Sequence, residues 1–285
     1  MGKWAFINKE FIPEQSASVH FCDLAIQRGY GVFDFFKIVN NSPVFLDEHL
    51  DRFFYSAEQM HLPIEQTKKE LHTIISELLF KNAIPDSGVR LTLTGGYSAD
   101  GYQLAKPNFI ISQSTLQAPS KEQFQKGIRL ISYDHQRQLP HVKSIDYLMA
   151  IWLQPLLQQR QADDILYHHN GIITECPRAN FFIVTKDDTI VTPQQNILKG
   201  ITRNTLIKIA GADFKMEQRD VSLQEVLQAK EAFVTSTTKK ILPVRSIDGR
   251  VLGETAGSIT KALFNLLHHK LTTQVKNPAN TTSTL

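Results

Sequence analysis

Cysteine is scarce in this sequence, since Cys22 and Cys176 are the only two among 285 residues. They stand far apart and lack the spacing of paired metal ligands, so neither a disulfide framework nor a cysteine-held metal organises the fold. The sequence therefore predicts two reduced thiols in a cytoplasmic protein, and no metal site.

Long hydrophobic runs and one-sided charge are also missing. No apolar stretch approaches the roughly 20 residues that span a bilayer, and the N-terminal MGKWAFINKEF lacks the apolar core of a signal peptide. The net charge is +3 with histidine neutral, and basic residues alternate with acidic ones. This pattern predicts a soluble protein without a membrane or nucleic-acid partner.

The common nucleotide-binding loops, G-x-G-x-x-G and G-K-[ST], do not occur. Strict β-α-β alternation is absent as well, so the hydrophobic patterns predict a mixed α/β (α+β) fold in two domains. We expect an N-terminal α/β domain at 1–112, a linker at 113–120, a C-terminal α/β domain at 121–271 and a disordered tail at 272–285.

Hydrophobic periodicity and turn residues predict the following elements. In the first part we expect strands at 4–7, 11–12, 32–39, 44–46, 89–94 and 108–112, and helices at 48–60 and 66–82. In the second part we expect strands at 128–133, 165–168, 172–174, 181–185, 189–191 and 232–235, and helices at 144–159, 201–210 and 258–269. Asn170-Gly171 predicts a tight hairpin turn.

Four motifs, HVKSIDYL, ITECPRANFFIV, NILKGITRNTLIKIA and FVTSTTKKILPV, carry a family resemblance that covers residues 4–267. In this order and approximate spacing they resemble the class IV aminotransferases, which include branched-chain aminotransferases, D-amino-acid transaminases and aminodeoxychorismate lyases. The resemblance implies a two-domain fold-type-IV enzyme with pyridoxal 5'-phosphate between the domains. It also implies a homodimer that transfers an amino group from an amino acid to a 2-oxo acid.

The resemblance assigns the catalytic centre. Lys143 in HVKSIDYL matches the lysine that carries the cofactor as a Schiff base, although a lone lysine at a helix start is usually a solvated surface residue. Tyr147 matches a residue that contacts the cofactor ring, or else it simply packs on its helix. Glu175 matches the acid that faces the pyridine nitrogen and keeps it protonated, against the alternative of a surface acid beside a turn.

Three segments match the family's phosphate site. Arg52 matches a phosphate-binding arginine, whose planar fork suits two oxygens. Gly200 is expected to let the backbone turn tightly before Ile201 and Thr202, whose amides suit an anion at a helix start. Ser236, Thr237 and Thr238 offer hydroxyls and amides at a strand end. Each segment alone could be a solvated helix face, a helix cap or a polar turn.

The residues at the predicted substrate positions do not all match the same subgroup of the family. Asp100 replaces the arginine that D-amino-acid transaminases and lyases usually carry in this loop. Tyr102 and Phe33 replace a histidine and a tyrosine of the transaminases. Arg90 matches an arginine of the branched-chain enzymes, and Thr238 is a further candidate. We therefore favour an apolar or branched-chain L-amino acid as donor. A D-amino-acid transaminase, an aminodeoxychorismate lyase and a non-catalytic cofactor- or metabolite-binding protein remain the alternatives.

Overall fold

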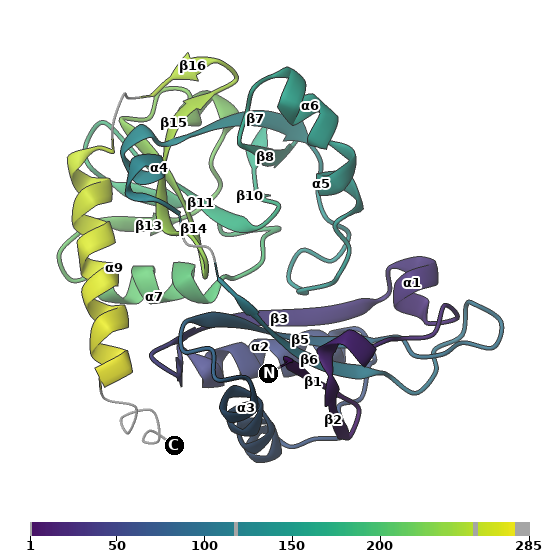
Figure 1. Ribbon diagram of the computed structural model, residues 1–285. Coiled ribbons are helices and arrows are strands. Elements are labelled where there is room, and N and C mark those ends of the chain that lie inside the picture. The colour runs from purple at the N-terminus through teal and green to yellow at the C-terminus, as the bar shows by residue number, and fades with distance from the viewer. Residues whose placement is uncertain (1, 117–118, 253–255, 277–285) are drawn as a thin grey trace. The chain divides into compact units, whose positions relative to one another are not determined.

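The structure is a computed structural model that describes residues 2–116, 119–252 and 256–276. It divides into two compact units, of which the first contains Met1–Leu116 and Val142–Asp146, and the second Gln117–His141 and Tyr147–Thr272 (Figure 1). The short segment 142–146 therefore belongs to the first unit, whereas the sequence placed it inside the second domain. None of the described helices is long and apolar enough to cross a membrane.

The first unit is built on a six-stranded antiparallel sheet. Its strands lie in the order β2 (Glu10–Pro13), β1 (Trp4–Ile7), β6 (Phe109–Thr115), β5 (Ser87–Thr94), β3 (Gly31–Val39) and β4 (Ser42–Pro43). The helices α2 (Leu46–Gln59) and α3 (Lys68–Asn82) cover the same side of this sheet (Figure 1). The shorter η1 (Glu14–Ser16) and α1 (Leu24–Arg28) precede β3.

The core of this unit lies between the sheet and the two helices. Val89, Leu91 and Leu93 of β5 are buried there, and they pack in one cluster with residues of α2 such as Leu50. Arg90 is exposed, on the opposite face of the strand. The strand predicted at 89–94 is therefore confirmed, and its alternate side chains point to opposite faces of the sheet.

The second unit is built on a ten-stranded mixed sheet. Along its main path lie β13 (Met216–Gln218), β12 (Ile190–Thr192), β11 (Ala179–Val184), β14 (Glu231–Ser236), β15 (Lys240–Ile247), β7 (Ile128–Asp134), β8 (Asp164–His169) and β9 (Ile172–Ile173). Two short strands, β10 (Glu175–Cys176) and β16 (Arg250–Val251), pair with β11 and β15. The described helices are α4 (Lys121–Lys126), α5 (Leu148–Trp152), α6 (Gln154–Gln159), α7 (Ile201–Ala210), α8 (Leu223–Val226) and α9 (Ser258–Lys276).

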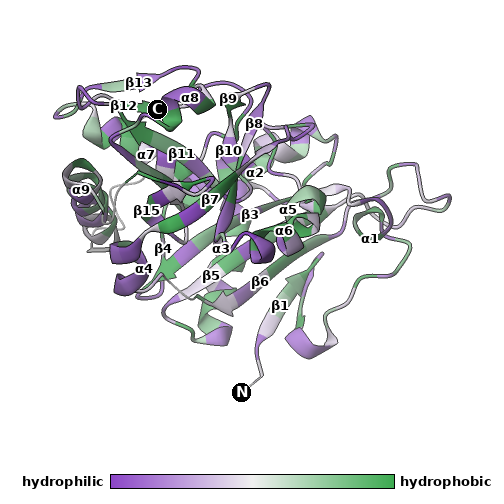
Figure 2. Ribbon diagram, turned by 90° about the horizontal axis from the view of Figure 1, so that it is seen from above, coloured by the Kyte–Doolittle hydropathy of each residue, from purple (hydrophilic) through white to green (hydrophobic). Residues whose placement is uncertain are grey.

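Both faces of the middle strands are buried, which explains their continuous apolar runs. Phe181 of β11 belongs to one hydrophobic cluster and its neighbour Phe182 to another. The second cluster includes Leu206 of α7 and Leu263 of α9, so these two helices cover that face. Figure 2 shows hydrophobic and hydrophilic residues together along α9, as expected for a helix with one buried side.

Local signals in the sequence predicted several elements correctly. The turn at Asn170 and Gly171, which have φ of 50° and 78°, joins β8 to β9 as predicted. The helix predicted at 66–82 is observed as α3, Lys68–Asn82, which Thr67 caps through a reciprocal capping box with Glu70. The predicted helix at 201–210 coincides with α7, which begins directly after Gly200.

The second predicted hairpin is tighter than expected. Asn40 and Asn41 both adopt positive φ, and the return strand β4 covers only Ser42–Pro43. The strand expected at 44–46 is therefore wrong, since Phe45 already precedes α2. Positive φ at two consecutive positions makes a two-residue turn, for which asparagine is well suited.

The helix expected at 144–159 is also wrong at its start. Residues 142–146 are not helical, because their backbone pairs with β3 through a bridge between Val32 and Ser144. Helix begins only at Leu148, and it is divided into α5 and α6 at a point where Pro155 stands at the start of α6. Proline suits the first turn of a helix and not its interior.

Three further boundaries differ from expectation. β6 continues to Thr115 and so takes the first residues of the linker expected at 113–120, of which 117–118 lie outside the described residues. β15 was not predicted, and it contains Pro243, a residue that is uncommon in a central strand. α9 extends to Lys276, past the predicted end at 269, and the rest of the predicted tail lies outside the described residues.

Candidate functional site

The segment that carries Lys143 is held on β3 by hydrogen bonds of its backbone. The Phe33 amide donates to the Lys143 carbonyl at 3.0 Å, and the Ile145 amide donates to the Gly31 carbonyl at 3.0 Å. The Lys143 amide itself donates to the Ser56 hydroxyl of α2 at 3.2 Å. These contacts fix the backbone on both sides of the lysine, so its side chain starts from a rigid position.

Two cations share the ring of Phe33. The Lys143 Nζ atom lies 4.6 Å from the ring centroid, and the guanidinium carbon of Arg90 lies 4.4 Å from it. The two cationic groups can therefore be no farther apart than the sum of these distances. Phe33 is buried, and a buried aromatic face attracts cations without carrying a charge of its own. Of the predicted substrate residues, Phe33 and Arg90 are thus brought close to the predicted catalytic lysine.

Arg52, the predicted phosphate ligand, forms a two-pronged ion pair with Asp34. Its Nε atom donates to Oδ2 at 2.8 Å and its Nη2 atom to Oδ1 at 2.9 Å. His49 Nδ1 lies 2.6 Å from the same Oδ1 atom. Sequence reasoning missed Asp34 and His49. An acid within the apolar run GVFDFFKIV, and a histidine three residues before Arg52 on one helix face, were the signals available.

Glu175 is a buried carboxylate that belongs to β10. Its Oε1 atom accepts hydrogen bonds from Arg137 Nε at 3.0 Å and from Nη2 at 2.8 Å, and its Oε2 atom accepts one from the Leu198 amide at 3.0 Å. The arginine and the amide both stabilise the charged form of the acid. The sequence indicated Glu175 but not Arg137, which carries no motif of its own.

The start of α7 lies beside two polar side chains of the sheet. Asn180 Nδ2 donates to the Leu198 carbonyl at 2.7 Å, and its Oδ1 atom would lie 2.1 Å from a Cβ atom on Gly200. Gly200 has φ of −64°, so the glycine is needed for this close approach and not for the tight turn expected from the sequence. Ile201 and Thr202 then begin the helix, whose first amides have no acceptor within the helix.

A buried hydroxyl without a partner marks the same region. Thr235 stands opposite Asn180 in the pairing of β11 with β14, so the two side chains lie on one face of the sheet. Among the described residues, Thr235 Oγ1 is buried and accepts or donates no hydrogen bond. Such an atom costs free energy unless a ligand or water satisfies it. It therefore fits a ligand with polar atoms beside the start of α7.

Ser236, Thr237 and Thr238 form the end of β14 and the turn that leads into β15. The Ser236 hydroxyl lies 3.3 Å from the Thr238 hydroxyl and accepts a hydrogen bond from the Lys239 amide at 3.1 Å. The turn thus holds its own hydroxyls close together immediately after Thr235. Tyr147 is half-buried and stands directly before α5, with no side-chain cap on that helix.

The loop around Asp100, whose sequence distinguishes the candidate activities, is held in shape by hydrogen bonds to Asp100 itself. Asp100 Oδ1 accepts hydrogen bonds from the amides of Tyr102 and Gln103, both at 2.9 Å, and from the Ser98 hydroxyl at 3.0 Å. The Gln103 amide, with the other two donors, lowers the pKa of Asp100. Tyr102 is 85% exposed. Asp100 therefore stays charged and stabilises the loop.

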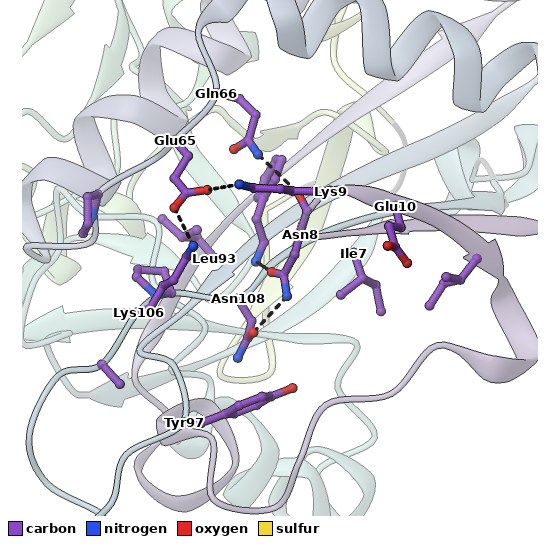
Figure 3. Close-up of a pocket in the computed structure, with 15 residues that line it drawn as sticks. Ile7, Asn8, Lys9, Glu10, Glu65, Gln66, Leu93, Tyr97, Lys106 and Asn108 are labelled. Carbon is purple, nitrogen blue, oxygen red and sulfur yellow. Dashed lines mark hydrogen bonds and ion pairs between the residues drawn. The ribbon is translucent and has the colours of Figure 1, made fainter.

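A cavity of about 910 Å³ lies in the first unit, beside the turn between β1 and β2. Figure 3 shows Glu65 between Lys9 and Lys106, at 3.5 and 2.7 Å from their Nζ atoms. None of the residues predicted for the site lines this cavity. The two lysines pair with Glu65 at the surface, and the cavity is not part of the candidate site.

Comparison with known proteins identifies the family. A model of amino-transferase class IV matches residues 31–247. The chain is 31% identical to a putative branched-chain-amino-acid aminotransferase of Methanocaldococcus jannaschii, over 90% of this chain and 93% of that protein. It is 29% identical to a D-alanine aminotransferase of Bacillus licheniformis, over 93% and 95%.

A solved structure agrees in fold. The branched-chain amino acid aminotransferase of Escherichia coli superposes with a TM-score of 0.88 at 23% identity, covering 95% of this chain and 95% of that one. The chain belongs to the class IV aminotransferases. This membership confirms the predicted fold class, the enzyme class and the cofactor, pyridoxal phosphate, and another branched-chain enzyme of this fold was solved with pyridoxamine 5'-phosphate.

The groups present in each unit fit this cofactor. The first unit contains the Lys143 amine and the Arg52 guanidinium, and the second contains the buried Glu175 carboxylate. Thr235 Oγ1, buried and without a partner among the described residues, suits a ligand oxygen. An amine, a carboxylate and donors for a phosphate are the three functions that the cofactor requires of a protein.

Proposed function

We propose that this class IV aminotransferase uses Lys143 as the amine that holds pyridoxal phosphate, with Glu175 serving the pyridine nitrogen. Arg52, the first amides of α7 and the hydroxyls that follow Thr235 bind the phosphate, and Tyr147 contacts the ring. The bound cofactor supplies an electron sink for the electrons of the substrate Cα–H bond. With the cofactor bound, the free amine of Lys143 would be the base that accepts the proton from the substrate Cα atom.

We further propose that the donor is an apolar or branched-chain L-amino acid and that the acceptor is a 2-oxo acid. The observation that carries this proposal is the Phe33 ring, which has Lys143 on it at 4.6 Å and Arg90 at 4.4 Å. The Arg90 cation near the Lys143 amine suits the second carboxylate of an acceptor such as 2-oxoglutarate. The Phe33 ring offers an apolar wall to the side chain of an apolar donor. Tyr102 and Thr238 are the further substrate contacts we propose.

A second candidate is amino transfer from D-amino acids. Its support is the similarity to proteins named D-alanine aminotransferase, one of them 29% identical over 93% of this chain. Against it stands Asp100, an acid at the position where those enzymes carry an arginine. Its charge is retained by hydrogen bonds within the loop. The same acid argues against a lyase that acts on a substrate with carboxylates, because like charges repel.

Arg90→Ala, tested beside a donor screen, separates these candidates. With the native enzyme we expect L-leucine to exceed D-alanine as donor. The variant should raise the KM for 2-oxoglutarate roughly tenfold, as for one lost charged hydrogen bond, and the KM for an apolar 2-oxo acid much less. Steady-state kinetics with both acceptors measures the difference. Arg245→Ala, at an exposed position of β15, provides the control.

Robust transfer from D-alanine with none from L-leucine would overturn the proposed donor class. An equal rise of KM for both acceptors would show that Arg90 does not bind the second carboxylate of 2-oxoglutarate. Either result leaves the assignment of Lys143 in place, because the covalent attachment of the cofactor does not depend on the donor.

We also propose a homodimer. Leu148, Ile151 and Trp152 are all more than 60% exposed, and their spacing places them on one face of α5. An exposed apolar face of this kind favours a contact with another protein chain.

Trp152→Glu should convert the dimer to monomers, as measured by light scattering, whereas Gln159→Glu on α6 should not. A wild-type monomer at micromolar concentration would contradict the proposal. We also propose a cytoplasmic location, where thiols stay reduced, since both cysteines are free.

A further inference from the structure

Asp34 is a fully buried acid in the middle of β3. Its carboxylate accepts four hydrogen bonds. Arg52 gives two of them, at 2.8 and 2.9 Å, and the Phe35 amide and His49 Nδ1 give one each, at 2.7 and 2.6 Å. A buried carboxylate with this many donors is fixed in position and orientation, so any group that it holds is fixed as well.

The geometry of the ion pair leaves one edge of Arg52 for another anion. Asp34 occupies the edge formed by Nε and Nη2, and no hydrogen bond of Nη1 occurs within the described part of the chain. The side chain of Arg52 is 12% exposed, so the outer edge is close to solvent. A planar guanidinium can pair with two anions in this way, one on each edge.

The charges in the cluster favour the same arrangement. Burial raises the pKa of Asp34, but Arg52 and His49 together outweigh it and hold this pKa well below its ordinary value. Burial lowers the pKa of His49. His49 Nδ1 lies 2.6 Å from Oδ1, and since an ionised carboxylate can only accept, the nitrogen donates the hydrogen bond. Arg52 makes the two-pronged contact with the same carboxylate.

We infer that Asp34 and His49 are positioning residues that hold the Arg52 guanidinium with its outer edge set to bind the phosphate of the cofactor. The inference rests on the proposed role of Arg52. An arginine side chain in water samples many rotamers, and ordering it on binding costs free energy. The Asp34 carboxylate makes Arg52 ordered before the phosphate arrives, so the phosphate binds more tightly.

A purely structural ion pair and a positioning pair differ in what they do to ligand preference. Loss of a purely structural pair lowers the stability of the chain and weakens the binding of all ligands alike. Loss of a positioning pair weakens the binding of pyridoxal phosphate and leaves the binding of pyridoxal, which lacks the phosphate, almost unchanged. The ratio of the two affinities is therefore a readout that a loss of stability alone does not move.

The experiment measures the dissociation constants of pyridoxal phosphate and pyridoxal for the full chain by fluorescence titration, after removal of bound cofactor. Asp34→Asn keeps the shape of the side chain and removes its charge. We expect it to reduce the preference for pyridoxal phosphate about tenfold, as for one lost charged contact. His49→Phe keeps a buried ring without the donor and should give a smaller loss in the same direction. Thermal melts verify that each variant is folded.

Two further variants separate the possible failures. Arg52→Ala should lose at least as much preference as Asp34→Asn, and an unchanged preference there would overturn the proposed role of Arg52 itself. If Arg52→Ala loses the preference and folded Asp34→Asn and His49→Phe keep it, the positioning role is overturned and the proposed function stands. Asp51→Asn is the matched control, because Asp51 neighbours Arg52 in sequence but pairs with Lys68.

Discussion

Lys143→Ala is expected to lose essentially all amino transfer. The proposed mechanism needs the amine twice, once to hold the cofactor and once to move the substrate proton, and alanine can do neither. Steady-state assays with a saturating donor and acceptor measure the loss. A second readout does not depend on activity. Reduction of the native protein with borohydride, followed by peptide mass mapping, should place the cofactor on the peptide that contains Lys143.

Lys126→Ala is the matched control for this experiment. Lys126 forms an exposed ion pair with Glu122 at the end of α4, and such pairs contribute little to stability. Its loss should leave both the rate and the labelling unchanged. Cofactor found on any other lysine of the native protein would contradict the assignment of Lys143, even if the alanine variant proved inactive.

Glu175→Gln is expected to keep the cofactor and lose about two orders of magnitude in kcat, as is typical when one preorganised electrostatic partner is removed. A carboxylate stabilises a protonated pyridine nitrogen, and a neutral amide does so far less. Arg137 would also lose its charged acceptor, to which it donates at 2.8 and 3.0 Å. Stopped-flow measurement of single turnovers separates this chemical step from substrate binding.

Glu231→Gln provides a control with another buried acid of the same unit. Glu231 accepts hydrogen bonds from the Thr260 amide at 2.8 Å and from the Thr260 hydroxyl at 2.7 Å at the start of α9. Its replacement should lower stability by about 1 kcal/mol, as for other helix caps, with little change in kcat. If Glu175→Gln retained full kcat, the pyridine nitrogen would need a different partner.

The two acids show why burial alone does not identify a catalytic residue. Glu175 and Glu231 are buried to a similar degree and both accept backbone hydrogen bonds. Glu231 satisfies the first turn of a helix, which is a structural requirement of every helix. Glu175 is paired with an arginine from a distant part of the chain, and it stands in a motif shared with the family.

The sequence by itself determined the family, the enzyme class and the elements that depend on local signals. Asn170 and Gly171 specify a turn because both adopt positive φ, and Thr67 specifies a helix start because its hydroxyl reaches an amide three residues later. The alternation around Arg90 specifies a half-buried strand. In each case the interacting groups are near neighbours in the chain, so their spacing is visible in the sequence.

Only the tertiary structure decided how the side chains of the candidate site are held. Asp34 meets Arg52 across 18 residues, and Arg137 meets Glu175 across 38. The segment of Lys143 looked like the start of a helix, but it takes its backbone hydrogen bonds from β3, more than 100 positions earlier. A sequence pattern records local propensity and periodicity. It does not record which distant donor satisfies a buried carboxylate or an open strand edge, and those contacts decided the geometry of this site.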